Sequence, residues 1–269
     1  MRNSIFITAI LALCFISCKT DKKEPATTET IIENNVDVET TTSDTSSEIK
    51  ITPIEHATMV LEYKNVVVYV DPVGGAEKFT EQKPPSIILV TDIHGDHFNE
   101  ETLSGILGNA VKIIAPGAVA ELLPKPLRDR TLVLNNSQNR DYTFDGVEIN
   151  IEAVPMYNLR EEALKFHEKG RGNGYILTMG GKRIYISGDT EDIPEMRNLK
   201  DIDMAFVCMN LPYTMTVESA ASAVLDFKPK QVYPYHYRGQ GGLSDVEKFK
   251  TIVNDKNDAI EVVQLDWYK

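Results

Sequence analysis

A short apolar run near the middle of the chain constrains the fold more than any other feature. The stretch SIILVT, residues 86–91, has four consecutive aliphatic side chains and no charged residue. A strand that is apolar on both faces must be covered on both faces, as in sheets flanked by helices or by a second sheet. The sequence therefore predicts an α/β fold with this strand inside it.

The pattern around this run alternates between strands and helices in each half of the chain. Three β-branched runs precede it and read as a meander, and strands and helical patterns then alternate after it. Two mixed β-sheets flanked by helices, an αββα sandwich, satisfy this pattern. The expected strands are 48–54, 58–63, 65–72, 86–91, 111–116, 131–135, a hairpin within 141–155, 174–180, 182–190, 203–209, 231–237 and 259–265. The expected helices are 99–108, 117–123, 216–227 and 244–254, with Asn99 and Thr216 at helix starts.

The first 48 residues are expected to lie outside the globular domain. Residues 1–17 have a basic residue followed by a short apolar stretch, which indicates a secretory signal peptide. The sequence FISC, ending at Cys18, resembles the lipobox of bacterial lipoproteins, which implies a lipidated cysteine and an exported protein anchored to a bacterial membrane, on its periplasmic or surface face. Residues 18–48 are rich in Thr, Glu, Asp and Ser and are expected to form a disordered tether, which leaves residues 49–269 as the one globular domain.

Composition excludes some partners. The net charge is −12 and no block of Lys and Arg stands out, so nucleic acid is not an expected partner. Within residues 49–269 the only cysteine is Cys208, in an apolar run, and we expect it to be a buried structural residue.

Titratable residues crowd into the turn after the apolar run. The sequence TDIHGDHF contains Asp92, His94, Asp96 and His97, at the C-terminal end of a buried strand, where α/β proteins commonly place a site. Further donors, His167, Asp189 and His236, lie near other strand ends. Carboxylates brought together repel one another and resist desolvation, and a divalent cation removes that conflict. The pattern therefore predicts a metal site.

These motifs resemble those of the metallo-β-lactamase superfamily. TDIHGDH is similar to its H-x-H-x-D-H signature, GDT (188–190) to its bridging aspartate, and PYHY (234–237) to its last histidine. HATMVLEY from His56, with Asp71-Pro72, is similar to the branch that contains ascorbate-phosphate lactonase and related metal-dependent hydrolases. The resemblance implies the metallo-β-lactamase-like sandwich and a centre of two divalent ions, Zn or Mn, with Fe as a further option.

The resemblance also implies roles for residues. His94, Asp92 and either His167 or Asn158 would hold one ion, and Asp96, His97 and His236 the other, with Asp189 bridging. Asp92 departs from the family pattern, because it stands where the family has its first histidine.

Three further sets of residues carry open alternatives. His56 is assigned to the pocket beside Asp96 as a catalytic residue, against a structural role. Asp71 is either a cap or a carboxylate that orients a ligand histidine. Four cations around His167, namely Arg160, Lys165, Lys169 and Arg171, either bind an anionic group of the substrate or form a solvated surface balanced by glutamates, and we favour the second interpretation.

The expected function is hydrolysis of an ester, lactone or phosphoester bond of a small molecule by a metal-bound hydroxide, with a lactonase-like enzyme as the first choice. A phosphodiesterase or phospholipase-like hydrolase is the alternative within the enzyme class. A non-catalytic metal-binding scaffold is the alternative outside it. An anionic substrate remains an option, and membrane contact is expected through the lipid on Cys18 only.

Overall fold

The computed structural model describes residues 48–108 and 111–269, all of which belong to one compact unit, Asp44–Lys269. The expected signal peptide and all but the last residue of the expected tether lie outside the described residues. No helix within the described ranges has the length and apolar character needed to cross a bilayer.

The first sheet combines an antiparallel meander with a parallel extension. Strands pair in chain order, antiparallel from β1 to β3 and parallel from β3 to β6. Its strands are β1 (Lys50–Glu55), β2 (Thr58–Tyr63), β3 (Val66–Val70), β4 (Ile87–Leu89), β5 (Lys112–Ala115) and β6 (Thr131–Val133).

The second sheet is mixed as well. Its strand order is β15-β12-β11-β10-β9-β8-β7, antiparallel from β7 to β10 and parallel from β10 onward. Its strands are β7 (Asn139–Phe144), β8 (Val147–Met156), β9 (Gly172–Met179), β10 (Lys182–Ile186), β11 (Met204–Val207), β12 (Gln231–Pro234) and β15 (Glu261–Val262). A separate two-stranded ribbon pairs β13 (Arg238–Gly239) with β14 (Gly242–Leu243).

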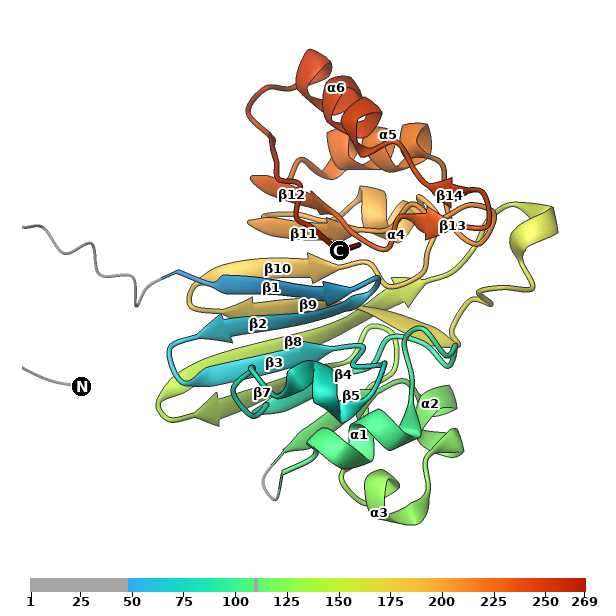
Figure 1. Ribbon diagram of the computed structural model, residues 1–269. Helices are drawn as coiled ribbons and strands as arrows, with labels where there is room; N and C mark the ends of the chain where they lie inside the picture. The colour runs from blue at the N-terminus through green and yellow to red at the C-terminus, as the bar shows by residue number, and fades with distance from the viewer. Residues whose placement is uncertain (1–47, 109–110) are drawn as a thin grey trace, which may run out of the picture. The chain divides into compact units, whose positions relative to one another are not determined.

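Helices lie outside the two stacked sheets, as Figure 1 shows, with α1 to α3 beside the first sheet and α5 and α6 beside the second. The helices are α1 (Glu100–Ile106), α2 (Gly117–Leu122), α3 (Lys125–Arg128), α4 (Pro194–Arg197), α5 (Val217–Phe227) and α6 (Val246–Lys256), with short 3₁₀ turns η2 (Ala76–Phe79) and η3 (Glu161–Ala163). The prediction of an αββα sandwich is confirmed.

Alternation along the inner strands explains why the first sheet is covered on both faces. Val66 and Val68 of β3 pack in the large core cluster that includes the second sheet, whereas Val67 and Tyr69 pack with α1 to α3 in a separate cluster. Strand β4 divides in the same way, with Ile87 and Leu89 on one side and Ile88 on the other. This two-sided burial is what the apolar run 86–91 predicted.

Local signals placed the helix starts correctly. The side chain of Asn99 accepts a hydrogen bond from the backbone N–H of Thr102, and that of Thr216 accepts one from Ser219. Cys208 is fully buried, and burial raises the pKa of its thiol to about 11, as expected for a structural cysteine. The four-residue helices α3 and α4 and the β13–β14 ribbon were not predicted, because such short elements carry no periodicity.

The two sheets are joined by hydrogen bonds at one end. The backbone N–H of Asn173 donates to the carbonyl of Thr91 at 2.9 Å, and the Tyr175 hydroxyl donates to the carbonyl of Val90, also at 2.9 Å. This end is the one at which β4 and β10 finish, so the loops that follow both strands come together there.

Gly174 in β9 allows close approach of neighbouring backbone at this joined end. A Cβ at this position would lie 2.8 Å from the carbonyl oxygen of Ser187 and 3.0 Å from that of Ile186. We predict that Gly174→Ala lowers the free energy of unfolding by about 1–3 kcal/mol, because the backbone must shift to accept the methyl group. Urea denaturation followed by circular dichroism measures the change. The matched control is Gly241→Ala, where a Cβ meets no atom within 4 Å, and an equal loss in both variants would contradict the explanation.

Candidate metal centre

Loops from both sheets carry the candidate ligands to one place. Asp71 follows β3, residues 92–97 follow β4, Asp189 follows β10, and His236 follows β12. The ends of parallel strands share one edge of each sheet, so side chains that are far apart in sequence converge there.

Three buried side chains form the centre of this group. The Nε2 atoms of His97 and His236 lie 3.0 Å apart, and the two oxygens of Asp189 lie 3.4 Å from His97 Nε2 and 3.2 Å from His236 Nε2. Four donors around a zinc ion at about 2.1 Å stand roughly 3.4 Å from one another in a tetrahedral arrangement. The spacing of His97, Asp189 and His236 therefore fits a divalent metal ion.

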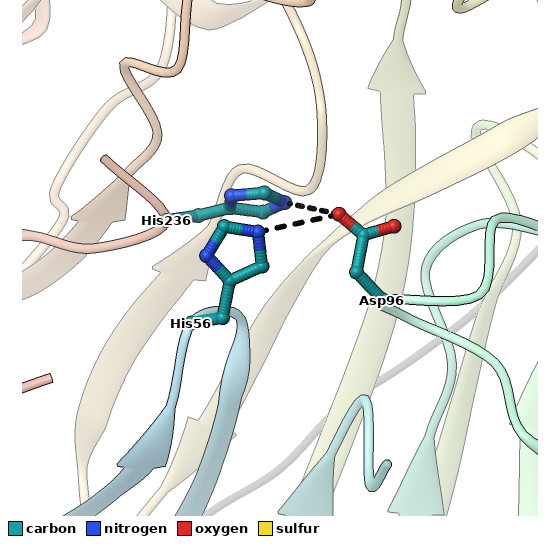
Figure 2. Close-up of side chains that lie close together, drawn as sticks. All are labelled: His56, Asp96 and His236. Carbon is teal, nitrogen blue, oxygen red and sulfur yellow. Dashed lines mark ion pairs between the residues drawn. The ribbon is translucent and has the colours of Figure 1, made fainter. Parts of the chain in front are cut away.

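Asp96 lies on the open side of these three residues. Its Oδ2 is 3.4 Å from His236 Nε2, and its Oδ1 is 3.9 Å from His97 Nε2. Figure 2 shows His56 and His236 pointing at the same oxygen of Asp96, with His56 Nε2 at 3.3 Å. The Asp96 side chain keeps 42% of its surface exposed, so it can meet both the centre and a substrate.

Three buried atoms in the group have no hydrogen-bond partner among the described residues: Asp189 Oδ1, His167 Nε2 and His236 Nδ1. His167 Nε2 lies 3.1 Å from the other oxygen of Asp189, and Asp189 Oδ1 lies 3.2 Å from His236 Nε2. Buried polar atoms almost always have a partner, because leaving one unpaired costs free energy. A metal ion is the partner that these donor types prefer, so the residues present fit such a group.

Attraction between the Asp189 carboxylate and the neighbouring imidazoles determines their protonation states. Burial would raise the pKa of Asp189, but the imidazoles of His236, His97 and His167 outweigh burial and hold that pKa well below its usual range. Burial would lower the pKa of His97, but Asp189 and Asp71 outweigh it and raise that pKa well above the ordinary value. The pocket thus keeps its carboxylate ionised, as a metal ligand must be.

Asp71 orients His97. Its Oδ2 lies 2.8 Å from His97 Nδ1, and it accepts hydrogen bonds from the backbone N–H and the hydroxyl of Thr91. A carboxylate on Nδ1 keeps the proton of that nitrogen in place, so Nε2 is the His97 atom that would lose its proton and bind a metal ion. The structure thereby selects the orienting role for Asp71 from the two that the sequence left open.

The choice between His167 and Asn158 is also decided by geometry. His167 is buried and its Nδ1 lies 3.2 Å from the carbonyl of Tyr213, which leaves Nε2 facing Asp189. Asn158 instead donates to the carbonyls of Ala163 and Tyr213. His167 is brought to the centre, and Asn158 supports the loop that carries it.

The hydrogen bonds of Tyr268 assign a donor role to His56. The Tyr268 hydroxyl accepts the backbone N–H groups of Tyr237 and Arg238, both at 3.0 Å, and lies 2.8 Å from His56 Nδ1. With both lone pairs of the hydroxyl engaged, its proton is donated to His56 Nδ1. The proton of a neutral His56 ring is then on Nε2, which donates to Asp96 Oδ2.

Asp92 contacts Arg171. Its Oδ2 accepts from Arg171 Nη2 at 2.8 Å and lies 2.9 Å from His94 Nδ1, and its Oδ1 accepts from Arg171 Nε at 3.2 Å. Burial would raise the pKa of Asp92, but the hydrogen bonds from His94 and Arg171 outweigh it and the pKa is lowered. The interpretation of Arg171 as a solvated surface cation was wrong, because its partner is this buried carboxylate.

Three residues of the site have left-handed backbone. The φ angles of His56, Asp71 and His236 are 57°, 45° and 46°. The left-handed region costs free energy for residues other than glycine. The backbone N–H of His236 donates to the carbonyl of His56 at 3.2 Å, which ties the two strained turns together across the sheets.

Comparison with known proteins decides the family. The β-lactamase superfamily domain matches residues 50–236. The chain belongs to the metallo-β-lactamase superfamily. It is 29% identical over 222 residues to a UPF0173 metal-dependent hydrolase of Thermococcus kodakarensis, covering 79% of this chain and 95% of that protein. It is 31% identical over 233 residues to one of Archaeoglobus fulgidus, covering 81% and 96%.

A solved structure agrees with this assignment. The crystal structure of a protein from Parabacteroides distasonis, described as a metal-dependent hydrolase, matches with a TM-score of 0.71 at 39% identity, over 82% of this chain and 94% of that chain. Membership of the superfamily gives the enzyme class, a metal-dependent hydrolase. The bond that it cleaves is a separate question.

A pocket of about 310 Å³ opens onto the centre. It is lined by His94, Asp96, Phe166, His167, Asp189, Asn210 and Tyr213. Phe166 and Tyr213 pack edge to face with ring centroids 5.1 Å apart and form its apolar wall. A pocket of this size accommodates a small molecule.

Every residue that the sequence assigned to the site lies in this region of the structure. The sequence missed Tyr268 and did not single out Arg171. Neither residue stands in a motif, and each acts through a contact with a residue that is distant in the chain, so no local signal could have found them.

The role of the Tyr268 hydroxyl in orienting His56 can be tested by mutation. We predict that Tyr268→Phe lowers kcat about tenfold on a chromogenic nitrophenyl ester, because the His56 ring loses the donor that fixes its tautomer, while bound metal stays unchanged. Steady-state kinetics and metal analysis measure both quantities. Tyr237→Phe is the control, because the Tyr237 hydroxyl makes no hydrogen bond within the described residues. Loss of metal from Tyr268→Phe would show that His56 is a ligand.

Proposed function

We propose that this protein hydrolyses an ester, lactone or phosphoester bond of a small molecule at the centre formed by His97, Asp189 and His236. The observation that carries the proposal is the convergence of these three buried side chains, whose facing nitrogen and oxygen atoms lie 3.0–3.4 Å apart, beside an open pocket. A bound divalent ion would polarise the substrate oxygen and supply an activated nucleophile at neutral pH. Zn and Mn, with Fe as a further option, suit this set of imidazole and carboxylate donors.

The protein's own groups have separable tasks. His97, Asp189 and His236 hold the ion, and Asp71 holds His97. Asp96 faces the pocket and accepts a hydrogen bond from His56, which leaves its Oδ1 free to orient the attacking water. Burial would raise the pKa of Asp96, but the hydrogen bonds from His236 and His56 outweigh burial and hold that pKa well below its usual range, so Asp96 stays ionised as a hydrogen-bond acceptor. The proton that the water loses passes to the leaving oxygen, so that water and ester give acid and alcohol.

The lining of the pocket favours a substrate with an uncharged group next to the scissile bond. Of the four cations near His167, Arg160 pairs with Glu191 at 2.7 Å, Lys169 with Glu195 at 2.9 Å, and Arg171 with Asp92. These three charges are already engaged, which leaves Lys165, with its Nζ 5.1 Å from the centroid of the Phe166 ring, as the one of the four that could meet an anionic group. The Phe166–Tyr213 wall suits an apolar group instead.

A panel of substrates separates the alternatives. Carbonyl esters and lactones with neutral substituents should be cleaved at higher kcat/KM than phosphodiesters of similar size. Preferential cleavage of phosphodiesters would favour the phosphodiesterase alternative. Bound metal without hydrolysis of any of these would favour the non-catalytic scaffold.

Metal removal tests the centre directly. We predict that chelation abolishes hydrolysis and lowers Tm by several degrees, because the ion binds only the folded chain and its loss leaves buried charges uncompensated. Asp189→Asn should bind no metal and show less than 1% of the activity. The control is Asp226→Asn, an exposed aspartate paired with Arg197, which should keep both. Full hydrolysis by Asp189→Asn would exclude this centre as the site of reaction.

We further propose that the enzyme is exported and anchored by lipid on Cys18. The support is the sequence of residues 1–18, which has the charge, apolar stretch and terminal cysteine of a lipoprotein signal. We predict that Cys18→Ser moves the protein from the detergent-rich to the aqueous phase in Triton X-114 partition. Cys14→Ser, within the expected signal peptide, is the control and should stay in the detergent-rich phase. An unchanged partition of Cys18→Ser would exclude the lipid anchor.

A further inference from the structure

The guanidinium of Arg171 occupies the side of the centre where the sequence predicted one of the two metal ions. Arg171 precedes β9 and contacts both oxygens of Asp92, with Nη2–Oδ2 at 2.8 Å and Nε–Oδ1 at 3.2 Å. Nη2 also donates to the carbonyl of Phe166 at 2.5 Å. A two-point contact with a fully buried carboxylate is a specific arrangement rather than a surface ion pair.

His94 is engaged by the same pair. Its Nδ1 lies 2.9 Å from Asp92 Oδ2, so Nδ1 is the donor nitrogen and Nε2 carries the lone pair. That lone pair faces Arg171 Nη2 at 3.4 Å. The two protons of Arg171 Nη2 are directed at Asp92 Oδ2 and the carbonyl of Phe166, so the guanidinium blocks the approach to His94 Nε2 without donating to it. The buried His167 Nε2 also has no partner among the described residues, and it lies 3.1 Å from Asp189.

Charge leads to the same conclusion. An arginine stays protonated in proteins, so it brings a permanent positive charge to Asp92. Asp92 therefore keeps its compensating cation whether or not a metal binds, whereas the groups around Asp189 are imidazoles, which must lose their protons to bind a metal. A divalent ion bound to Asp92 and His94 would meet the guanidinium as a like charge, and the group Asp92–His94–His167 does not fit a second ion while Arg171 is in place.

We propose that Arg171 replaces one of the two metal ions, so that this centre binds a single divalent ion at His97, Asp189 and His236, with Asp96 and His167 beside it. The inference rests on the proposed function only in requiring a metal centre. It deepens that proposal, because the protein itself supplies the positive charge that one of the two predicted metal ions would have supplied. That charge does not depend on the concentration of metal. It also gives a physical reason for an aspartate at position 92, since a histidine there would not hold the guanidinium.

The test counts bound ions. The full-length protein, solubilised in detergent, is stripped with EDTA, reloaded with excess Zn²⁺ or Mn²⁺, desalted and analysed by mass spectrometry for metal per chain. The wild type and Arg171→Lys, which keeps the charge, should each hold one ion. Arg171→Gln should hold two, because the like charge is removed and Asp92 and His94 become free to bind.

A variant of the partner carboxylate provides a second readout. Asp92→Asn should still hold one ion, because Asp92 is the partner of Arg171 and not a ligand, whereas Asp189→Asn should hold none. Circular dichroism establishes that each variant is folded, and the wild-type count decides the question even if Arg171→Gln does not fold.

Each other outcome overturns the inference. Two ions in the wild type, loss of the ion from Asp92→Asn, or a count of one in a folded Arg171→Gln would each contradict the role of Arg171. The first of these would leave the proposed hydrolase function standing. A wild type that folds and holds no ion would overturn the proposed function itself, so the two failures are distinguishable.

Discussion

Burial of negative charge is the constraint on which the rest of this structure depends. Asp71, Asp92 and Asp189 are each almost completely withdrawn from water within one site. An ionised carboxylate in such a place needs a partner of opposite charge or several hydrogen-bond donors. Each of the three carboxylates has a different set of partners in this structure. The chemistry of the pocket follows from those differences.

The three buried aspartates have different partners and therefore different roles. Asp71 is satisfied by Thr91 and His97, and its effect is to orient that imidazole. Asp92 is satisfied by Arg171, which places a permanent cation in the wall of the pocket. Asp189 is surrounded by three imidazoles and retains an oxygen without a hydrogen-bond partner among the described residues, so it is the carboxylate placed to exchange the protons of its neighbours for a metal ion.

Much of the architecture was predictable because local physics fixes it. The apolar strand 86–91 had to be covered on both faces, and the caps at Asn99 and Thr216 are contacts within a few residues. The residues of the TDIHGDH motif were found for a similar reason, since they are adjacent in sequence and follow a buried strand.

What the sequence did not reveal depends on contacts between distant segments. Arg171 was one of four cations in a loop, and only the fold shows that it reaches Asp92, 79 positions away. The contact of Tyr268 with His56 spans 212 positions. His167 and Asn158 were equally placed by spacing, because nine residues of irregular loop can return either side chain to the centre. Contacts of this kind form only when distant segments of the chain are brought together by folding. The periodicity of the sequence carries no information about them.

The left-handed backbone of His56, Asp71 and His236 has a consequence for the evolution of the pocket. Asparagine or glycine would relax all three turns, so drift under selection for thermal resistance alone would tend to erase them. A laboratory library screened only for heat survival should therefore lose these three side chains first. A screen that alternates selection for heat resistance with selection for activity should instead find stabilising substitutions in the outer helices. Substitutions there do not affect the reaction.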